Sequence, residues 1–126
     1  MRIYDTSALI GEIRNGSVDP QEYILDLTSY EVGNVLYKRV KLMKNITKEE
    51  AHIVASVVNQ WTNVICIGQE YLSDILDLSV ELNASFYDSS YGFAAKKFNA
   101  ELLTSDKKLY DKIKGKIKAK YLEPQD

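Results

Sequence analysis

Residues 3–10, IYDTSALI, contain the local signal that decides the fold. They read as a short apolar strand, one aspartate, two hydroxyl residues and the start of a helix. Asp5 therefore stands where a buried strand ends and a helix begins. A carboxylate at such a junction needs a physical reason, either in the stability of the helix or in the chemistry of a site.

The composition favours a single compact domain. The chain has 126 residues, 45% of them hydrophobic, which suits one domain spanning residues 1–126 with a core of its own. No apolar run approaches the roughly 18 residues of a membrane span, so we expect a cytoplasmic protein with no membrane association. Cys66 and His52 are the only residues of their types, too few for an internal disulfide or a zinc site, and we expect both to serve structure.

The charge is nearly balanced overall but unevenly distributed. The net charge is −2, from 16 basic and 18 acidic residues. Seven lysines lie between residues 107 and 120 against one acid, Asp111. A second basic group, Lys38, Arg39, Lys41 and Lys44, lies on a predicted helix. Solvated faces are the simplest interpretation of both groups.

Strands and helices are predicted to alternate along the chain. Apolar runs predict strands at 2–4, 23–27, 64–67, 100–104 and 119–122. Periodicity and capping predict helices at 7–14 and 29–43, one opened by a capping box at 47–50, one at 69–82, one capped by Asp88 or Ser89 and running to Asn99, and one at 106–113. The run VICI at 64–67 favours a strand covered on both faces, and Leu72 and Leu76 are assigned to the core. This alternation predicts an α/β fold with a mainly parallel sheet flanked by helices.

Four carboxylates fall at predicted strand-to-helix junctions: Asp5, Glu31, Asp88 and Asp106. The carboxyl ends of parallel strands share one edge of a sheet, so these acids are expected to converge. Converging carboxylates repel one another, and a divalent cation such as Mg²⁺ or Mn²⁺, which prefers oxygen ligands, removes that conflict. Such a site suggests phosphodiester hydrolysis. Each acid alone is also explained by a favourable interaction with a helix dipole, worth about 0.3 to 1 kcal/mol.

Four segments carry a family resemblance: IYDTSALI (3–10), LTSYEVGNVL (27–36), FYDSSYGFAA (86–95) and LLTSDKKL (102–109). In this order they resemble the four acidic motifs of the PIN-domain ribonucleases, in particular the VapC-type toxins of toxin-antitoxin pairs. The resemblance implies a three-layer α/β/α domain with a central sheet of four to five strands. It also implies a Mg²⁺- or Mn²⁺-dependent endoribonuclease, a small VapB-like antitoxin as partner, and a homodimer.

The resemblance also assigns roles to residues. Asp5, Asp88 and Asp106 match the metal ligands, and Glu31 matches the acid of the second motif. Two hydroxyl residues match supporting positions, Ser7 in the first motif and Thr104 before the last acid. Some relatives carry a further acid where this chain has Tyr91 and Gly92, so whether one or two metals bind stays open.

Further candidates follow from spacing alone. Asn34 lies one helical turn after Glu31, so it either orients that carboxylate or packs between helices. Lys107 and Lys108 follow Asp106 directly and are candidates for binding RNA phosphates at the mouth of the acidic site.

Two other functions fit parts of the sequence. The same scaffold with acids used only as helix caps would be a non-catalytic module that binds RNA or protein. A phosphotransfer domain of the haloacid dehalogenase type is disfavoured, because its motif needs a second aspartate two positions after Asp5, where this chain has Ser7.

Overall fold

The computed structural model describes residues 1–124. The helices are α1 (Thr6–Asn15), α2 (Thr28–Tyr37), η1 (Lys38–Leu42, a π-helical continuation of α2), α3 (Lys48–Asn59), η2 (Gln69–Tyr71), α4 (Leu72–Leu82), α5 (Phe86–Lys97) and α6 (Lys107–Ile113). The strands are β1 (Arg2–Tyr4), β2 (Ile24–Leu25), β3 (Val64–Ile65), β4 (Glu101–Thr104) and β5 (Ala119–Tyr121). None of the helices in this described part of the chain is long and apolar enough to cross a membrane.

Local signals fix the helix ends. Asp5, with extended backbone, caps α1, and its side chain accepts a hydrogen bond from the backbone N–H of Ala8. Gly16 ends α1 in the left-handed conformation, at φ 72°, which costs a glycine little. The predicted capping box at the start of α3 is confirmed, because Thr47 and Glu50 each satisfy the other's backbone N–H.

The strands are parallel, as predicted, but they form two small sheets. One sheet has the order β1-β4-β5, and β2 pairs with β3 in the other. A single parallel bridge between Ile3 and Tyr23 joins them side by side. The prediction of one central sheet of four to five strands was therefore slightly wrong. Strands of two or three residues are too short to sustain a continuous ladder through Tyr23.

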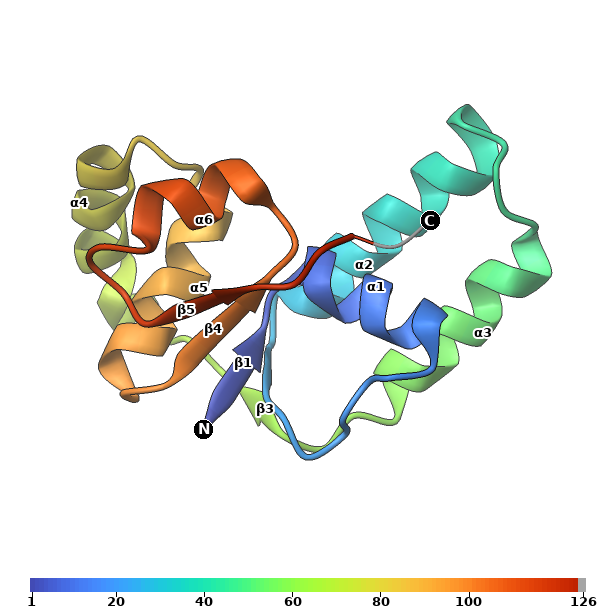
Figure 1. Cartoon of the computed structure of the whole chain (residues 1–126), viewed down its shortest axis with the longest axis horizontal. Coiled ribbons are helices and arrows are strands. Elements are labelled where there is room, and N and C mark those ends of the chain that lie inside the picture. Colours follow the sequence, from blue (N-terminus) through green and yellow to red (C-terminus); the bar gives the residue numbers. More distant parts are fainter. Residues whose placement is uncertain (125–126) are drawn as a thin grey trace.

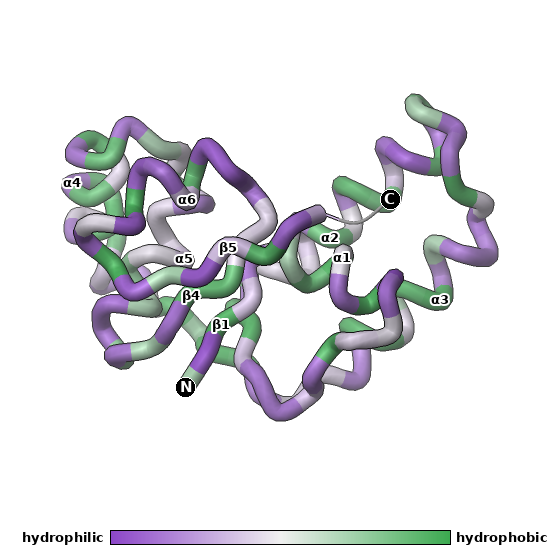
Figure 2. The backbone as a smooth tube through the Cα atoms, viewed as in Figure 1, coloured by the Kyte–Doolittle hydropathy of each residue, from purple (hydrophilic) through white to green (hydrophobic). Residues whose placement is uncertain are grey.

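Helices cover both faces of the strands, which confirms the three-layer architecture (Figure 1). Side chains alternate across a strand, so neighbouring residues enter different cores. Ile3 of β1 and Leu102 of β4 pack against α5 and α6 on one face. Tyr4 and Leu103, their immediate successors, pack against α1, α2 and α3 on the other. Figure 2 shows hydrophobic residues along β1 and β4, between these helical layers.

Three local predictions were wrong. The run VICI contains only a two-residue strand, β3, in which Ile65 is buried while Val64 and Cys66, on the opposite face, are exposed, so one face alone is covered. Of the predicted core face of α4, Ile75 and Leu82 are buried as expected, but Leu72 and Leu76 are exposed. These errors share one cause: an apolar pattern does not show which face of an element finds a partner.

Candidate active site

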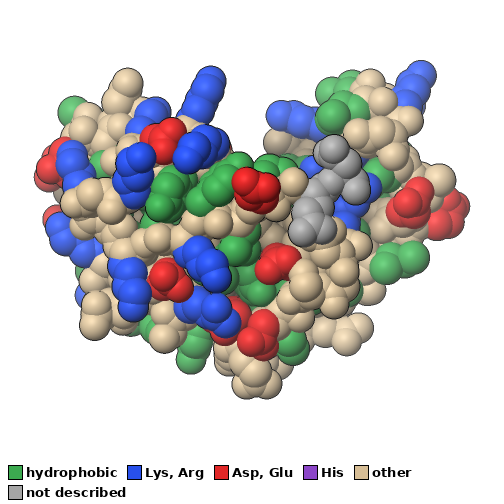
Figure 3. Space-filling view, viewed as in Figure 1, with side chains coloured by type: hydrophobic (Ala, Val, Ile, Leu, Met, Phe, Trp, Pro, Cys, Tyr) green, Lys and Arg blue, Asp and Glu red, His purple; other side chains and the backbone are tan. Residues whose placement is uncertain are grey.

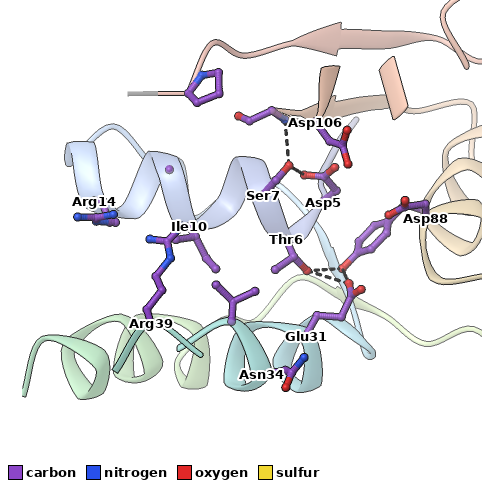
Figure 4. A pocket seen from close by; sticks show the side chains of 15 residues that line it. Asp5, Thr6, Ser7, Ile10, Arg14, Glu31, Asn34, Arg39, Asp88 and Asp106 are labelled. Atoms are coloured by element: carbon purple, nitrogen blue, oxygen red, sulfur yellow. Dashed lines mark hydrogen bonds between the residues drawn. The ribbon is translucent and has the colours of Figure 1, made fainter. Parts of the chain in front are cut away.

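A pocket of about 460 Å³ opens at the carboxyl ends of β1 and β4 (Figure 4). It is lined by Asp5, Thr6, Ser7, Ile10, Gly11, Arg14, Glu31, Asn34, Val35, Arg39, Asp88, Tyr91, Ser105, Asp106 and Pro124. All four acids singled out in the sequence line it, and they come from four separate elements: the junction before α1, then α2, α5 and the junction before α6. The surface is hollowed between the half that carries α6 and the half that carries α2 (Figure 3).

Asp5 lies at the base of the pocket and is 4% exposed. Its Oδ1 accepts hydrogen bonds from the Ala8 N–H at 2.9 Å and from the Ser7 hydroxyl at 2.7 Å. The Ser7 oxygen in turn accepts the backbone N–H of Ser105 at 3.0 Å. Ser7 therefore ties the loop before Asp106 to the first acid, as a supporting hydroxyl would.

Glu31 is held by a cluster of hydroxyl groups. Its Oε1 accepts hydrogen bonds from Thr6 Oγ1 and from the Tyr91 hydroxyl, both at 2.9 Å. Tyr91 also shares hydrogen bonds with Thr6 at 3.0 Å and with Thr28 at 2.7 Å. Thr6, Thr28 and Tyr91 are all buried, so this network fixes the Glu31 carboxylate from below the pocket floor.

The remaining two acids lie at the beginnings of helices. Asp106 caps α6, and its Oδ1 accepts the backbone N–H of Leu109 at 3.1 Å. Thr104, fully buried, accepts the Asp106 N–H at 3.0 Å and so shapes the turn that presents this acid. The prediction that Asp88 or Ser89 caps α5 was wrong. Ser85 is the cap, and Asp88 lies in the first turn with its side chain in the pocket.

The carboxylates influence one another electrostatically. Burial raises the pKa of Asp5 to about 6, and the negative charge of Asp88 adds to this against the opposing hydrogen bonds from Thr104, Ala8 and Ser7. Burial also raises the pKa of Asp88, and the charges of Asp106 and Glu31 raise it further. The charges of Asp106 and Glu31 thus raise the pKa of Asp88, and the charge of Asp88 raises that of Asp5, as expected for acids that lie close together.

The donor set suits a hard divalent ion. Four carboxylates and several hydroxyls offer oxygen alone, and the pocket lining contains no histidine or cysteine. Within residues 1–124 no group of three or more His, Cys, Asp or Glu side chains is already arranged to hold an ion. Burial first, and then neighbouring negative charge, raises the pKa of Asp5 and of Asp88, and a bound cation would favour their charged forms.

The other predicted site residues are placed less simply. Asn34 lines the pocket, but among the described residues Thr6 and Tyr91, not Asn34, donate to Glu31. Lys107 and Lys108 do not line the pocket. The Nζ of Lys107 instead lies 3.5 Å from Oδ1 of Asp111. It also lies over the rings of Tyr110 and Tyr121. Figure 3 shows lysine and arginine side chains gathered over the half that carries α6 and β5.

Several pocket residues were not recognised in the sequence. Tyr91 was noted only as a departure from acid-bearing relatives, yet it lies three residues after Asp88, on the same face of α5. That spacing is the signal that would have found it. Thr6 lies inside the quoted first motif, and its role depends on contacts with α2 and α5 that no local pattern shows.

No protein-family model matches the chain. Among curated proteins it is 32% identical over 94 residues to exonuclease VapC9 of Pyrobaculum aerophilum, covering 75% of this chain and 68% of that protein. It is 28% identical over 93 residues to ribonuclease VapC3 of the same organism, covering 72% and 70%. Among solved structures, PAE2754 from Pyrobaculum aerophilum matches with a TM-score of 0.75 and 28% identity, covering 93% of this chain and 89% of that one.

These similarities agree with the arrangement of the pocket. They extend over most of the chain, and the same four acids that resemble the family's motifs line one cavity. The chain therefore belongs to the VapC family of PIN-domain toxins.

Proposed function

We propose that this protein is a metal-dependent endoribonuclease, the toxin of a toxin-antitoxin pair, which cuts RNA in the cytoplasm. The observation that carries the proposal is the convergence of Asp5, Glu31, Asp88 and Asp106 from four elements on one pocket. The names of the relatives, an exonuclease and a ribonuclease, support a nuclease in general. Cleavage within the RNA strand and dependence on a metal ion are parts of our proposal that these names do not state.

Asp5, Asp88 and Asp106 are the residues that would hold Mg²⁺ or Mn²⁺. Asp5 and Asp106 each keep Oδ1 engaged in a helix cap, which fixes both carboxylates in the lining of the pocket. The ion would polarise a phosphoryl oxygen and activate a water molecule at neutral pH. Asp88 joins the set from the first turn of α5, where burial and then the charges of Asp106 and Glu31 raise its pKa.

Glu31 has a different environment and a different proposed role. Because Thr6 and Tyr91 both donate to Oε1, the carboxylate is held in one orientation. Its other oxygen, Oε2, has no hydrogen bond from residues 1–124 and can accept a proton from a water molecule or an RNA hydroxyl. Glu31 therefore serves as a positioned proton acceptor.

The partners follow from family membership. A small VapB-like antitoxin would bind the toxin and suppress cleavage, and the active species would be a homodimer. RNA is the substrate, with Lys107 and Lys108 as candidates for contacts to phosphates outside the pocket.

One observation favours the alternative, a non-catalytic module that binds RNA or protein. Two of the four acids are helix caps, Asp5 for α1 and Asp106 for α6, so part of their placement has a structural reason. Capping does not account for Glu31, which lies in the first turn of α2 and is not its cap. It also does not explain why all four acids line one cavity.

A circular single-stranded RNA tests the proposal, because it has no ends for an exonuclease to attack. The purified protein should open the circle with Mg²⁺ or Mn²⁺ and stop when EDTA is added, and Asp106→Asn should be inactive at unchanged circular dichroism. Cleavage that persists in EDTA would exclude the metal mechanism. Cleavage of linear RNA alone would replace the endonuclease by an exonuclease, and no cleavage of either RNA would favour the binding module.

A further inference from the structure

Two arginines line the same pocket as the acids and have no part in the proposed chemistry. Arg14 lies in the last turn of α1, and Arg39 lies in η1, beyond the end of α2. Within residues 1–124 neither forms an ion pair. Figure 4 shows both guanidinium groups at the end of the pocket away from Asp5 and Glu31.

The direction of the helices separates the acids from the arginines. Asp5 and Arg14 are nine residues apart along α1, which corresponds to about 13 Å at 1.5 Å per residue. Glu31 and Arg39 are eight residues apart along α2 and η1, or about 12 Å. Both helices leave the acidic end in the same direction, so the pocket has an acidic end and a basic end about 12 to 13 Å apart.

The basic end brings two like charges together. Burial lowers the pKa of Arg39, and the neighbouring charge of Arg14 lowers it further. Glu50 lies near Arg14, whose charge lowers the pKa of that carboxyl, but within residues 1–124 it forms no ion pair with either arginine. The two close cations repel each other, and an anion placed between them would remove that repulsion. The guanidinium fork matches the geometry of phosphate oxygens.

We propose that Arg14 and Arg39 form a binding subsite for a backbone phosphate of the RNA substrate, displaced along the strand from the bond that is cut. The proposal rests on the proposed function, because the acidic end defines the position of the cleaved bond. A separation of about 12 to 13 Å spans about four nucleotides of a stacked strand at about 3.4 Å each, and fewer where the strand is extended. The subsite would therefore hold the strand at a fixed register beside the acids.

Exposed aromatic side chains on α2, at helical spacing from Asn34, favour RNA over an acidic peptide. Tyr30, Asn34 and Tyr37 follow one another at helical spacing on α2, and Asn34 lines the pocket. Both tyrosines are exposed, at 83% and 55%. Exposed aromatic side chains beside a basic groove are the usual platforms on which unpaired bases stack. An acidic peptide could match the arginines, but it has no bases to stack on these rings.

The test measures RNA affinity without cleavage. In an Asp5→Asn background with EDTA, a fluorescent 12-nucleotide single-stranded RNA is titrated at several salt concentrations, with anisotropy as the readout. Adding Arg14→Gln and Arg39→Gln should lower the slope of log affinity against log salt by about 0.7, the value for one lost phosphate contact on a single strand. The variant pair Arg14→Lys and Arg39→Lys, which keeps the charge but not the fork, should restore the slope.

A matched control separates a local subsite from the general field. Lys96→Gln with Lys118→Gln makes the same change in net charge. Lys96 lies at the end of α5 and Lys118 precedes β5, both at the sheet edge opposite the pocket. This control should leave the slope within about 0.3 of the parent protein.

The outcomes are distinct. If Arg14→Gln with Arg39→Gln gives the same slope as the control Lys96→Gln with Lys118→Gln, at an unchanged melting temperature, the subsite is overturned. It is also overturned if the arginine variant loses antitoxin binding while its RNA affinity stays unchanged. If the double variant fails to fold because Arg14 only stabilises the end of α1, Arg39→Gln alone decides, and its slope should still lie below that of the parent protein. A lower slope in the Asp5→Asn background, together with a wild-type protein that cleaves no RNA in Mg²⁺ or Mn²⁺, would support the subsite and refute the proposed nuclease.

Discussion

Replacing Asp5 by asparagine should stabilise the metal-free protein at neutral pH. Asp5 is almost fully buried, and its pKa is raised to about 6 from an ordinary 3.8. Its charged form is therefore unfavourable in the folded state. Asparagine removes the charge with almost no change of volume, and its side-chain oxygen can keep the cap by accepting the Ala8 N–H and the Ser7 hydroxyl.

The size of the expected stability gain, and the pH range over which it appears, follow from the pKa of Asp5 in the folded state and its ordinary value. The difference of about two pKa units corresponds to roughly 3 kcal/mol at 1.36 kcal/mol per unit. Between pH 3.8 and 6 the folded state holds the Asp5 proton more tightly than the unfolded state, so wild-type stability falls as the pH rises through this window. Below it Asp5 is protonated in both states, and the advantage of the variant should vanish.

The assay is urea unfolding in EDTA at several values between pH 3.5 and 7.5. Asp5→Asn should unfold at higher urea at pH 7, by about 1 to 3 kcal/mol, with a smaller difference at pH 4. Asp111→Asn is the matched control, because the lysines at 107 and 114 lower the pKa of this exposed carboxyl. It should bring no gain at pH 7. A loss of stability in Asp5→Asn, or a gain that is the same at pH 4 and pH 7, would refute the argument.

Three more expectations follow from the site. Tyr91→Phe removes one hydroxyl from the network around Glu31, so it should lower the free energy of unfolding by about 1 to 3 kcal/mol. It should also reduce the cleavage rate while Mn²⁺ affinity stays near wild type. A wild-type cleavage rate at saturating RNA would contradict this role. Lys107→Ala with Lys108→Ala should weaken RNA binding and leave the cleavage rate at saturating RNA unchanged, and unaltered affinity would remove both lysines from the RNA surface. Co-expression with a neighbouring small antitoxin should yield a stable, inactive complex on size exclusion, and an active, uncomplexed toxin would count against the pairing.

The sequence predicted the order of elements well because their signals are local. A strand of three residues followed by Asp5, and the Thr47 to Glu50 capping box, depend on contacts within one or two helical turns. The alternation of elements then fixed a parallel arrangement, since parallel neighbours require crossovers. The convergence of the acids followed from the same topology, because the carboxyl ends of parallel strands meet at one edge.

The wrong predictions concern which surfaces find partners. Cys66 was expected to lie in a buried strand, but it follows the two-residue edge strand β3 and its side chain is exposed. Leu72 and Leu76 have the right period for a core face, and α5 packs against the other side of α4. Two short sheets in place of one reflect the weakness of a single bridge at Tyr23. Such outcomes depend on tertiary neighbours, which hydrophobic periodicity does not encode.

The basic side of the pocket was also missed for a tertiary reason. Arg39 belongs to a group with Lys38, Lys41 and Lys44 that reads as a solvated helix face. Only the packing of α1 beside α2 brings Arg39 close to Arg14, which is 25 residues earlier in the chain. The lysines next to Asp106 were the nearest cations in sequence, and the arginines are the ones that line the cavity.

A direct titration with Mn²⁺ tests the central claim that Asp5, Asp88 and Asp106 form one metal site. Calorimetry at pH 7.5 should show binding to the wild-type protein, and Asp5→Asn, Asp88→Asn and Asp106→Asn should each weaken it by at least about tenfold. Asp74→Asn, a matched change on the exposed side of α4, should bind Mn²⁺ as the wild type does. Wild-type protein that binds no Mn²⁺, or pocket variants that bind it as tightly as Asp74→Asn, would contradict the account.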